Sequence, residues 1–135
     1  MGDVYHIYAL LHNPTNKLYI GCSKRAERVQ QHLNQLRLGK HTNKAMQADC
    51  NKYGFDYTAY LLELVKDDGY IHSKQYEREA YWIHYYCTDD PKKGYNSSRF
   101  YQRQDLTGFK RIRSTKEVRE MMSQYYWLKA EVDLS

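Results

Sequence analysis

The chain has 135 residues and a formal net charge of +5, a length that is enough for one compact domain and too short for two well-packed ones. Hydrophobic residues make up 41% and charged residues 27%, which is typical of a globular protein and not of a disordered tail. Since no apolar run approaches the roughly 20 residues that span a bilayer, and the N-terminus lacks the features of a signal peptide, we expect a cytoplasmic protein without membrane contact.

The first two predicted elements form a β-hairpin. Residues 3–11 are rich in aromatic and aliphatic side chains, which favours a strand. A turn-forming stretch follows, and residues 17–22 predict a second strand, in which Gly21 indicates a bulge or a close backbone approach. The period of two puts Tyr8 and Tyr19 in positions where they can share one face of the hairpin.

Two helices are predicted next. Over residues 26–38 apolar side chains recur at i, i+4 and i+7 from Val29, and Gly39 is a natural end for this helix. A second helix spans about residues 43–53 and ends at Gly54. On this second helix Met46, Cys50 and Tyr53 form one apolar stripe.

The remaining elements complete an α/β domain. Residues 57–65 predict a third strand, and a third helix, which Ser73 can cap, runs to about residue 86. Ser114 and Glu117 have the spacing of a capping box at the start of a last amphipathic helix. This order predicts a small, mainly antiparallel three-stranded sheet flanked by helices, with a C-terminal basic loop and helix.

The cysteines predict no cross-link. There are three of them, Cys22, Cys50 and Cys87. An odd number without a CxxC pair fits neither a disulfide framework nor a four-ligand zinc site. We expect reduced thiols in the core of an intracellular protein.

The excess positive charge lies in one segment, residues 91–113. Residues 1–90 hold eleven cationic and eleven acidic side chains, whereas this segment holds seven cations against Asp105 alone. Aromatic side chains lie among the cations, a pattern typical of contacts to a nucleic-acid backbone, although a solvated basic loop has the same charge. The candidate DNA-binding residues are Lys92, Lys93, Arg99, Arg103, Lys110, Arg111 and Arg113.

A sparse set of polar residues can carry chemistry. Arg28 and His32 lie one helical turn apart and off the apolar stripe, and Glu79 lies off the stripe of the third helix. With the hairpin tyrosines they supply groups for proton transfer, a guanidinium for oxyanion charge and a carboxylate for a hard divalent cation, which phosphodiester hydrolysis requires. Each also has a structural alternative, such as an ion pair between Arg28 and Glu79. The full candidate set is Tyr8, Tyr19, Arg28, His32, His41, Glu79 and Asn96.

These residues lie in motifs that resemble the GIY-YIG nuclease family. His6-Ile7-Tyr8 is followed after ten residues by Tyr19-Ile20-Gly21, and similar motifs continue in order to about residue 97. The later ones are Arg28-x-x-x-His32-x-x-x-Leu36, Gly39-Lys40-His41-x-Asn43, Lys52-Tyr53-Gly54, Leu62-Glu63, Glu77-Arg78-Glu79-Ala80-Tyr81-Trp82-Ile83 and Gly94-Tyr95-Asn96. The sequence departs from the family at His6, which replaces the first glycine and is either a spare proton acceptor or a strand residue.

The resemblance implies a metal-dependent DNA endonuclease that hydrolyses phosphodiester bonds. Residues 1–97 are implied to form the nuclease domain, and residues 98–135 a basic extension that packs on it and grips double-stranded DNA. One active site per chain implies nicking by a monomer or double-strand cleavage by a homodimer. A compact enzyme of this kind suits a phage or another mobile element.

The resemblance also implies a role for each candidate. Glu79 would bind Mg²⁺ or Mn²⁺, Arg28 would offset charge on the phosphoryl oxygens, and Tyr8 would accept a proton from the attacking water and pass it towards His32. The supporting roles fall to Tyr19, which would position the water or the phosphate, to His41, which would contact phosphate or assist the leaving group, and to Asn96, which would orient Glu79 or the backbone of its turn.

Some alternatives stay open. The chain could be a non-catalytic nucleic-acid-binding protein that keeps the fold, or a structure-specific repair nuclease. Glu63 and Glu77 could compete with Glu79 for the metal. The histidines that match no motif, which we expect at the surface, are His12, His72 and His84.

Overall fold

The computed structural model describes residues 4–25, 27–66 and 74–96. In chain order the elements are β1 (Val4–His12), β2 (Lys17–Ser23), α1 (Glu27–Arg37), α2 (Lys44–Tyr53), β3 (Tyr57–Lys66) and α3 (Lys74–Tyr86). Each corresponds to an element predicted from the sequence, with ends that differ by one residue or none. The cap Ser73, the basic loop beyond residue 96 and the last helix lie outside the described residues.

The three strands form an antiparallel sheet in the order β2-β1-β3. On one side of β1 the register pairs Tyr8 with Gly21 and Leu10 with Tyr19, so both tyrosines lie on one face of the hairpin, as predicted. On the other side the pairing with β3 shifts between Ile7 and Tyr8. The irregularity therefore lies between β1 and β3, and Gly21 itself sits in a regular part of the ladder.

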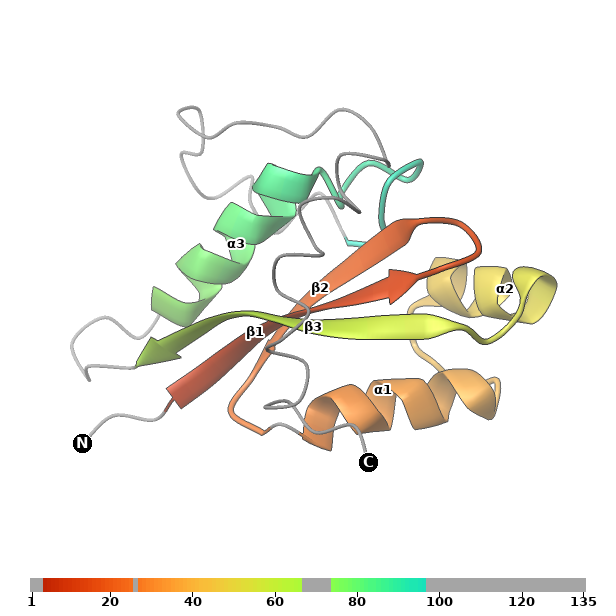
Figure 1. Ribbon diagram of the computed structural model, residues 1–135, viewed down its shortest axis with the longest axis horizontal. Helices are drawn as coiled ribbons and strands as arrows, with labels where there is room; N and C mark the ends of the chain where they lie inside the picture. The colour runs from red at the N-terminus through yellow and green to blue at the C-terminus, as the bar shows by residue number, and fades with distance from the viewer. Residues whose placement is uncertain (1–3, 26, 67–73, 97–135) are drawn as a thin grey trace.

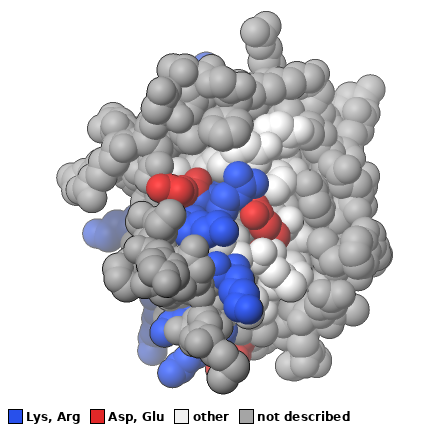
Figure 2. Space-filling view, turned by 90° about the vertical axis from the view of Figure 1, so that its left-hand side faces the viewer, with Lys and Arg blue, Asp and Glu red and all other residues white. Residues whose placement is uncertain are grey.

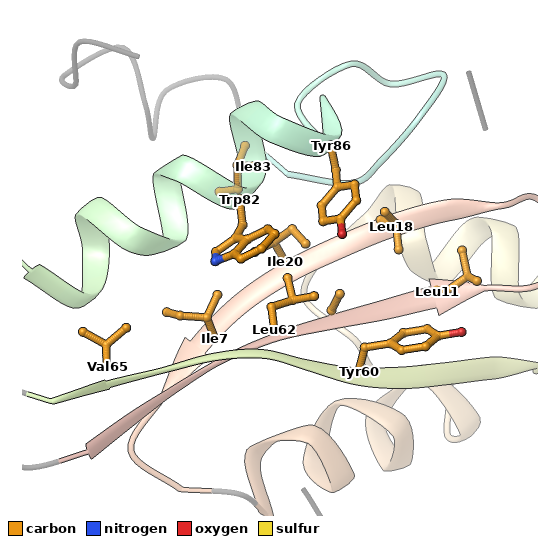
Figure 3. Close-up of a cluster of buried hydrophobic side chains, with 11 residues drawn as sticks. Ile7, Leu11, Leu18, Ile20, Tyr60, Leu62, Val65, Trp82, Ile83 and Tyr86 are labelled. Carbon is orange, nitrogen blue, oxygen red and sulfur yellow. The ribbon is translucent and has the colours of Figure 1, made fainter. Parts of the chain in front are cut away.

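The sheet is covered on both faces. Figure 1 shows α3 on one face and α1 on the other, with α2 near the end of α1. On the α3 face Ile7, Ala9 and Leu11 of β1 pack with Trp82 and Ile83 of α3 in an apolar cluster (Figure 3). The opposite cluster contains Tyr8 and Leu10 together with the α1 residues Val29, Leu33 and Leu36. Because the side chains of β1 alternate between the two faces of the sheet, they pack into both apolar clusters. Each large apolar side chain buried there stabilises the fold by roughly 1.5–3 kcal/mol.

The outer edge of β2 pairs with the segment that follows α3. The amide of Leu18 donates to the carbonyl of Lys93 at 3.1 Å, and the amide of Tyr95 donates back to the carbonyl of Leu18 at 3.0 Å. Gly94 lets this segment pack closely against Thr88, because a Cβ at this position would fall 2.4 Å from Cα of Thr88. This short parallel contact covers an edge that would otherwise present unpaired backbone groups.

Two of the histidines expected at the surface are buried. His12 is fully buried because its Nε2 donates to the carbonyl of Gly54 at 2.9 Å and its Nδ1 lies 2.7 Å from Oγ1 of Thr15. With both ring nitrogens hydrogen-bonded, burial of the ring carries little desolvation cost. His84 is 7% exposed, since the turn after α3 folds back on the end of that helix. His72 lies outside the described residues.

The structure also bears on the predicted state of the cysteines and on the length of the helices. Cys22, Cys50 and Cys87 are free thiols, of which Cys50 and Cys87 are buried and Cys22 is half-buried. Over the described ranges of the chain, none of the helices has the length and apolar character needed to cross a membrane.

Candidate active site

A cleft of about 380 Å³ opens where α1, α3 and β2 meet. Six of the seven candidate catalytic residues line it: Tyr19, Arg28, His32, His41, Glu79 and Asn96. The seventh, Tyr8, lies beneath the cleft and is only 2% exposed. The fold therefore gathers side chains from both faces of the sheet, since Tyr8, Tyr19 and α1 belong to one face and α3 to the other.

Gly21 makes room for the ring of Tyr8. A Cβ on Gly21 would fall 2.3 Å from Oη and 2.4 Å from Cζ of that tyrosine. Real Cβ atoms do not approach other atoms so closely, so a side chain here would displace the ring. The sequence leaves open a bulge or a close backbone approach at this glycine, whereas the group that approaches it is the side chain of Tyr8.

Tyr8 is the first member of a chain of hydrogen bonds. Its Oη lies 2.8 Å from Nε2 of His32, whose Nδ1 lies 2.7 Å from Nε2 of His41. The backbone amide of Asn43 donates to Nδ1 of His41 at 3.0 Å. Both ring nitrogens of His41 are therefore engaged within the protein, and the ring has no nitrogen left for the phosphate contact that the resemblance implies.

Burial keeps both of these histidines neutral. Desolvation, with smaller contributions from the electrostatic interactions of the protonated ring with Arg28 and His41, lowers the pKa of His32 to about 3. The pKa of His41 is also lowered, again by burial and then by Arg28. A charged imidazolium would lose its hydration in this position, so the neutral rings are the stable forms at physiological pH.

The two tyrosines are shifted towards their neutral forms. Burial is the largest cause that raises the pKa of Tyr8 and of Tyr19 above the ordinary value of 10.0. The positive charge of Arg28 acts in the opposite direction on both, whereas Glu79 raises both pKa values further. A cation bound near Glu79 would therefore help either tyrosine to lose its proton.

Glu79 is a buried carboxylate with no partner in the described part of the chain. It is 9% exposed, and desolvation raises its pKa to about 7. Arg28 hydrogen-bonds Gln31 at 3.3 Å, and among the described residues it forms no ion pair with Glu79. A buried anion without a countercharge is costly. The donor set thus fits a hard divalent cation, for which a carboxylate that opens into a cleft is a suitable ligand.

The two competing acids are in other surroundings. Glu63 accepts from Nε of Arg78 at 2.9 Å and from Nε1 of Trp82 at 2.9 Å, so its carboxylate is occupied. Glu77 is exposed on α3. Neither residue lines the cleft, and Glu79 is the only carboxylate among the described residues that does.

The side chain of Asn96 hydrogen-bonds the backbone of β2 and not Glu79. Its Oδ1 accepts from the amide of Ile20 and its Nδ2 donates to the carbonyl of Ile20, both at 2.9 Å. The side-chain amide thus takes the place of a peptide unit and continues the pairing that Leu18 begins. The expected contact with Glu79 or with the turn backbone is replaced by a clamp on the residue between Tyr19 and Gly21.

Other sequence candidates lie away from the cleft. Nδ1 of His6 is 3.3 Å from the carbonyl of Ser23 on the adjacent strand, which fits the simpler of its two interpretations. Lys92 is exposed and Lys93 half-exposed in the turn after α3. Figure 2 shows further Lys and Arg side chains gathered on the face at the left of Figure 1. The remaining basic candidates, Arg99, Arg103, Lys110, Arg111 and Arg113, lie outside the described residues.

The sequence did not single out Gln47 or the contacts of Asn43. Oε1 of Gln47 accepts from the amide of His41 at 3.0 Å, and its Nε2 donates to the carbonyl of Leu36 at 3.0 Å. Asn43 caps α2 by accepting from the amide of Met46, and its Nδ2 donates to the carbonyl of Tyr95 at 2.7 Å. Only the cap had a recognisable signal, an Asn directly before a helix.

The antiparallel sheet in the order β2-β1-β3 and the helices that cover it have the fold of the GIY-YIG nuclease catalytic domain. Two solved structures match it, each with a TM-score of 0.59. One is the catalytic domain of the homing endonuclease I-TevI, with 28% identity, 70% of this chain covered and 98% of that chain. The other is a mutant of the same intron endonuclease domain, with 29% identity and coverage of 69% and 92%. No protein-family model and no curated protein sequence matches the chain.

Proposed function

We propose that this protein is a metal-dependent DNA endonuclease that hydrolyses phosphodiester bonds. The observation that carries the proposal is Glu79, a buried carboxylate without a partner among the described residues that lines a cleft together with Arg28 and Tyr19. Support comes from the solved nuclease domains that share this fold. A protein that only binds nucleic acid would have no need for a buried acid at its phosphate-binding site.

Each side chain of the cleft has a task that suits its chemistry. Glu79 would hold Mg²⁺ or Mn²⁺, and such an ion supplies charge stabilisation for the phosphate and for the leaving oxygen when it is bound. The guanidinium of Arg28 offsets negative charge on the phosphoryl oxygens. Tyr8 is placed to act as the base, because Arg28 and a cation at Glu79 both favour its phenolate.

The substrate proposed is double-stranded DNA. The seven cations of residues 91–113 provide phosphate contacts, which position the enzyme on the duplex and carry little sequence information. One active site per chain cuts one strand at a time, so a monomer nicks, and a homodimer can cut both strands together. A small enzyme of this kind would serve a phage or another mobile element.

Cleavage of supercoiled plasmid tests the proposal. Wild-type protein with Mg²⁺ or Mn²⁺ is expected to yield open-circular product, and EDTA to abolish it. Glu79→Gln keeps the size of the side chain, removes its charge and is expected to lower the rate at least about a hundredfold. Glu77→Gln on the exposed side of the same helix is the matched control and is expected to stay within about twofold of wild type.

Two outcomes would contradict the proposal. Plasmid that stays intact while the wild-type protein still retards DNA in a gel would favour the non-catalytic binder, provided that branched and flapped duplexes also stay intact. Cleavage of branched duplexes alone would instead identify a structure-specific nuclease. Equal rates for Glu79→Gln and wild type would place the metal, and with it the active site, elsewhere.

A further inference from the structure

The hydrogen-bond chain from Asn43 to Tyr8 has a fixed direction. It begins at a backbone amide, which carries a hydrogen and can only donate. Nδ1 of His41 therefore accepts, and the proton of this neutral ring must be on Nε2. Each ring has one donor and one acceptor nitrogen when neutral, so the first donor decides every bond that follows.

The same reasoning applies to the next ring, that of His32. Nε2–H of His41 donates to Nδ1 of His32 across 2.7 Å, which leaves the proton of His32 on Nε2. Nε2–H of His32 then donates to Oη of Tyr8 across 2.8 Å. A doubly protonated His41 would place an N–H against the N–H of Asn43, so the chain has no room for an additional proton at that end.

We propose that Asn43 is a positioning residue whose backbone amide fixes the tautomers of His41 and His32, so that His32 is a hydrogen-bond donor to Tyr8 and not the acceptor of its proton. This reverses the transfer from Tyr8 towards His32 that the sequence resemblance implies. The hydroxyl proton of Tyr8 points away from His32, so Tyr8 would lose it to solvent in the adjoining cleft, and the N–H of His32 would then stabilise the phenolate that is left.

Hydrogen bonds in the loop around His41 fix the direction of the hydrogen-bond chain from Asn43 to Tyr8. Gln47 binds the amide of His41 and the carbonyl of Leu36, which fixes the link between α1 and α2. The side chain of Asn43 caps α2 and also holds the carbonyl of Tyr95. These contacts with Gln47, Met46 and Tyr95 hold the backbone that carries the Asn43 amide. The direction of this donor is therefore set by main-chain geometry and does not change when a side chain rotates.

Nitrogen-15 spectra of the histidine rings test the tautomers directly, without any nuclease assay. Long-range proton–nitrogen correlations at pH 7 are expected to show a neutral ring with the proton on Nε2 for both His32 and His41. A proton on Nδ1 of either ring, or a doubly protonated ring, would overturn the proposal. This measurement does not depend on the proposed function, so the two can fail separately.

The variant His41→Leu tests the role of the chain. Without the donor from His41, His32 is expected to populate the Nδ1–H tautomer as well, and the cleavage rate to fall about tenfold at unchanged DNA affinity. His6→Leu is the matched control, since the side chain of His6 lies by the carbonyl of Ser23 and, among the described residues, has no hydrogen bond to the chain of Tyr8, His32 and His41; it should leave the His32 tautomer and the rate unchanged.

The catalytic part of the inference rests on the proposed endonuclease function. If His41→Leu cuts at the wild-type rate, the chain does not position Tyr8 for catalysis, and the proposal is overturned even with the expected tautomers. If His41→Leu does not fold, Gln47→Leu replaces it: loosening His41 is expected to broaden or mix the His32 tautomer signal, and an unchanged signal with an unchanged rate would count against the proposal.

Discussion

The burial of Glu79 has an electrostatic consequence in the pH range where the protein is handled. In the folded protein its pKa is about 7, against an ordinary value of 4.5, because desolvation disfavours the charged form. Between pH 4.5 and about 7 the carboxyl group of Glu79 is protonated in the folded state and has lost its proton in the unfolded state. Its contribution to stability is therefore greatest below pH 4.5 and declines as the pH rises to about 7, by up to about 3 kcal/mol.

This gives a stability prediction for Glu79→Gln in EDTA. Urea unfolding of wild type and variant is expected to show little difference at pH 5 and a variant more stable by about 2–3 kcal/mol at pH 8. The difference between the two proteins removes the contribution of His32, whose lowered pKa of about 3 destabilises both as the pH falls below 6.5. Mg²⁺ should stabilise wild type and leave the variant unchanged. A pH-independent difference would show that Glu79 is not desolvated.

Gly21 gives a second prediction at this scale. Gly21→Ala is expected to destabilise the fold by about 1–3 kcal/mol and to abolish cleavage, because the new methyl group would fall 2.3 Å from the Tyr8 hydroxyl oxygen and displace the ring. Gly39→Ala is the control, since a Cβ there would meet no atom within 4 Å among the described residues beyond its chain neighbours, and its positive φ of 75° costs about 1 kcal/mol without moving the site. Both are measured by urea unfolding and plasmid cleavage. Full activity in Gly21→Ala would contradict the assigned position of Tyr8.

At the residue scale the sequence predicts side-chain positions better than hydrogen-bond partners. The period of two places Tyr8 and Tyr19 on one face, and the position of Glu79 off the apolar stripe anticipates its cleft. The burial of His12 could not be predicted, since it depends on the carbonyl of Gly54, 42 residues away. For the same reason the backbone donor to His41 has no signature in the sequence.

At the scale of elements, β2 depends on the clamp by Asn96. Asn96→Ala removes both hydrogen bonds to Ile20 and is expected to cost about 1–3 kcal/mol and to speed hydrogen exchange at the Ile20 amide. Asn96→Asp keeps the acceptor for this amide, so exchange there should stay slower than in Asn96→Ala, although its second oxygen faces a carbonyl. Equal exchange in both variants would mean that the Asn96 acceptor does not protect this amide.

The elements themselves were predictable because their signals are local. Apolar spacing and glycine ends place α1 and α2 to within one residue, and the cap of α2 at Asn43 is a local hydrogen bond. The strand irregularity between Ile7 and Tyr8 was not predicted, since it depends on pairing with β3 more than 50 residues later. Long-range register has no comparable local signal.

At the scale of the whole molecule, the position of the site follows from the topology. Tyr8, Tyr19 and α1 lie on one face of the sheet and α3 on the other, so their side chains can meet only beyond an edge strand. β2 is that strand, and the segment at residues 93–96 covers only its first half. The cleft begins where this cover ends, which explains why Ile20 and Asn96 line it.

The charge distribution gives the last prediction. If residues 91–113 contact DNA phosphates, replacing three of their cations by Gln should lower the slope of log affinity against log salt concentration by up to about 3, with little change in sequence preference. The control removes the same charge from exposed positions of α1 and α2. The tested set is Lys110, Arg111 and Arg113, and the control set is Arg37, Lys44 and Lys52.

Fluorescence anisotropy of a labelled duplex at several salt concentrations measures both slopes. A general attraction between a chain of net charge +5 and DNA would change equally in the two variants, because each loses three charges. A local contact would change the slope only in the variant of residues 91–113. Equal slopes in the two variants would show that this segment is a solvated basic loop and that DNA is held by other cations, such as those on the basic face in Figure 2.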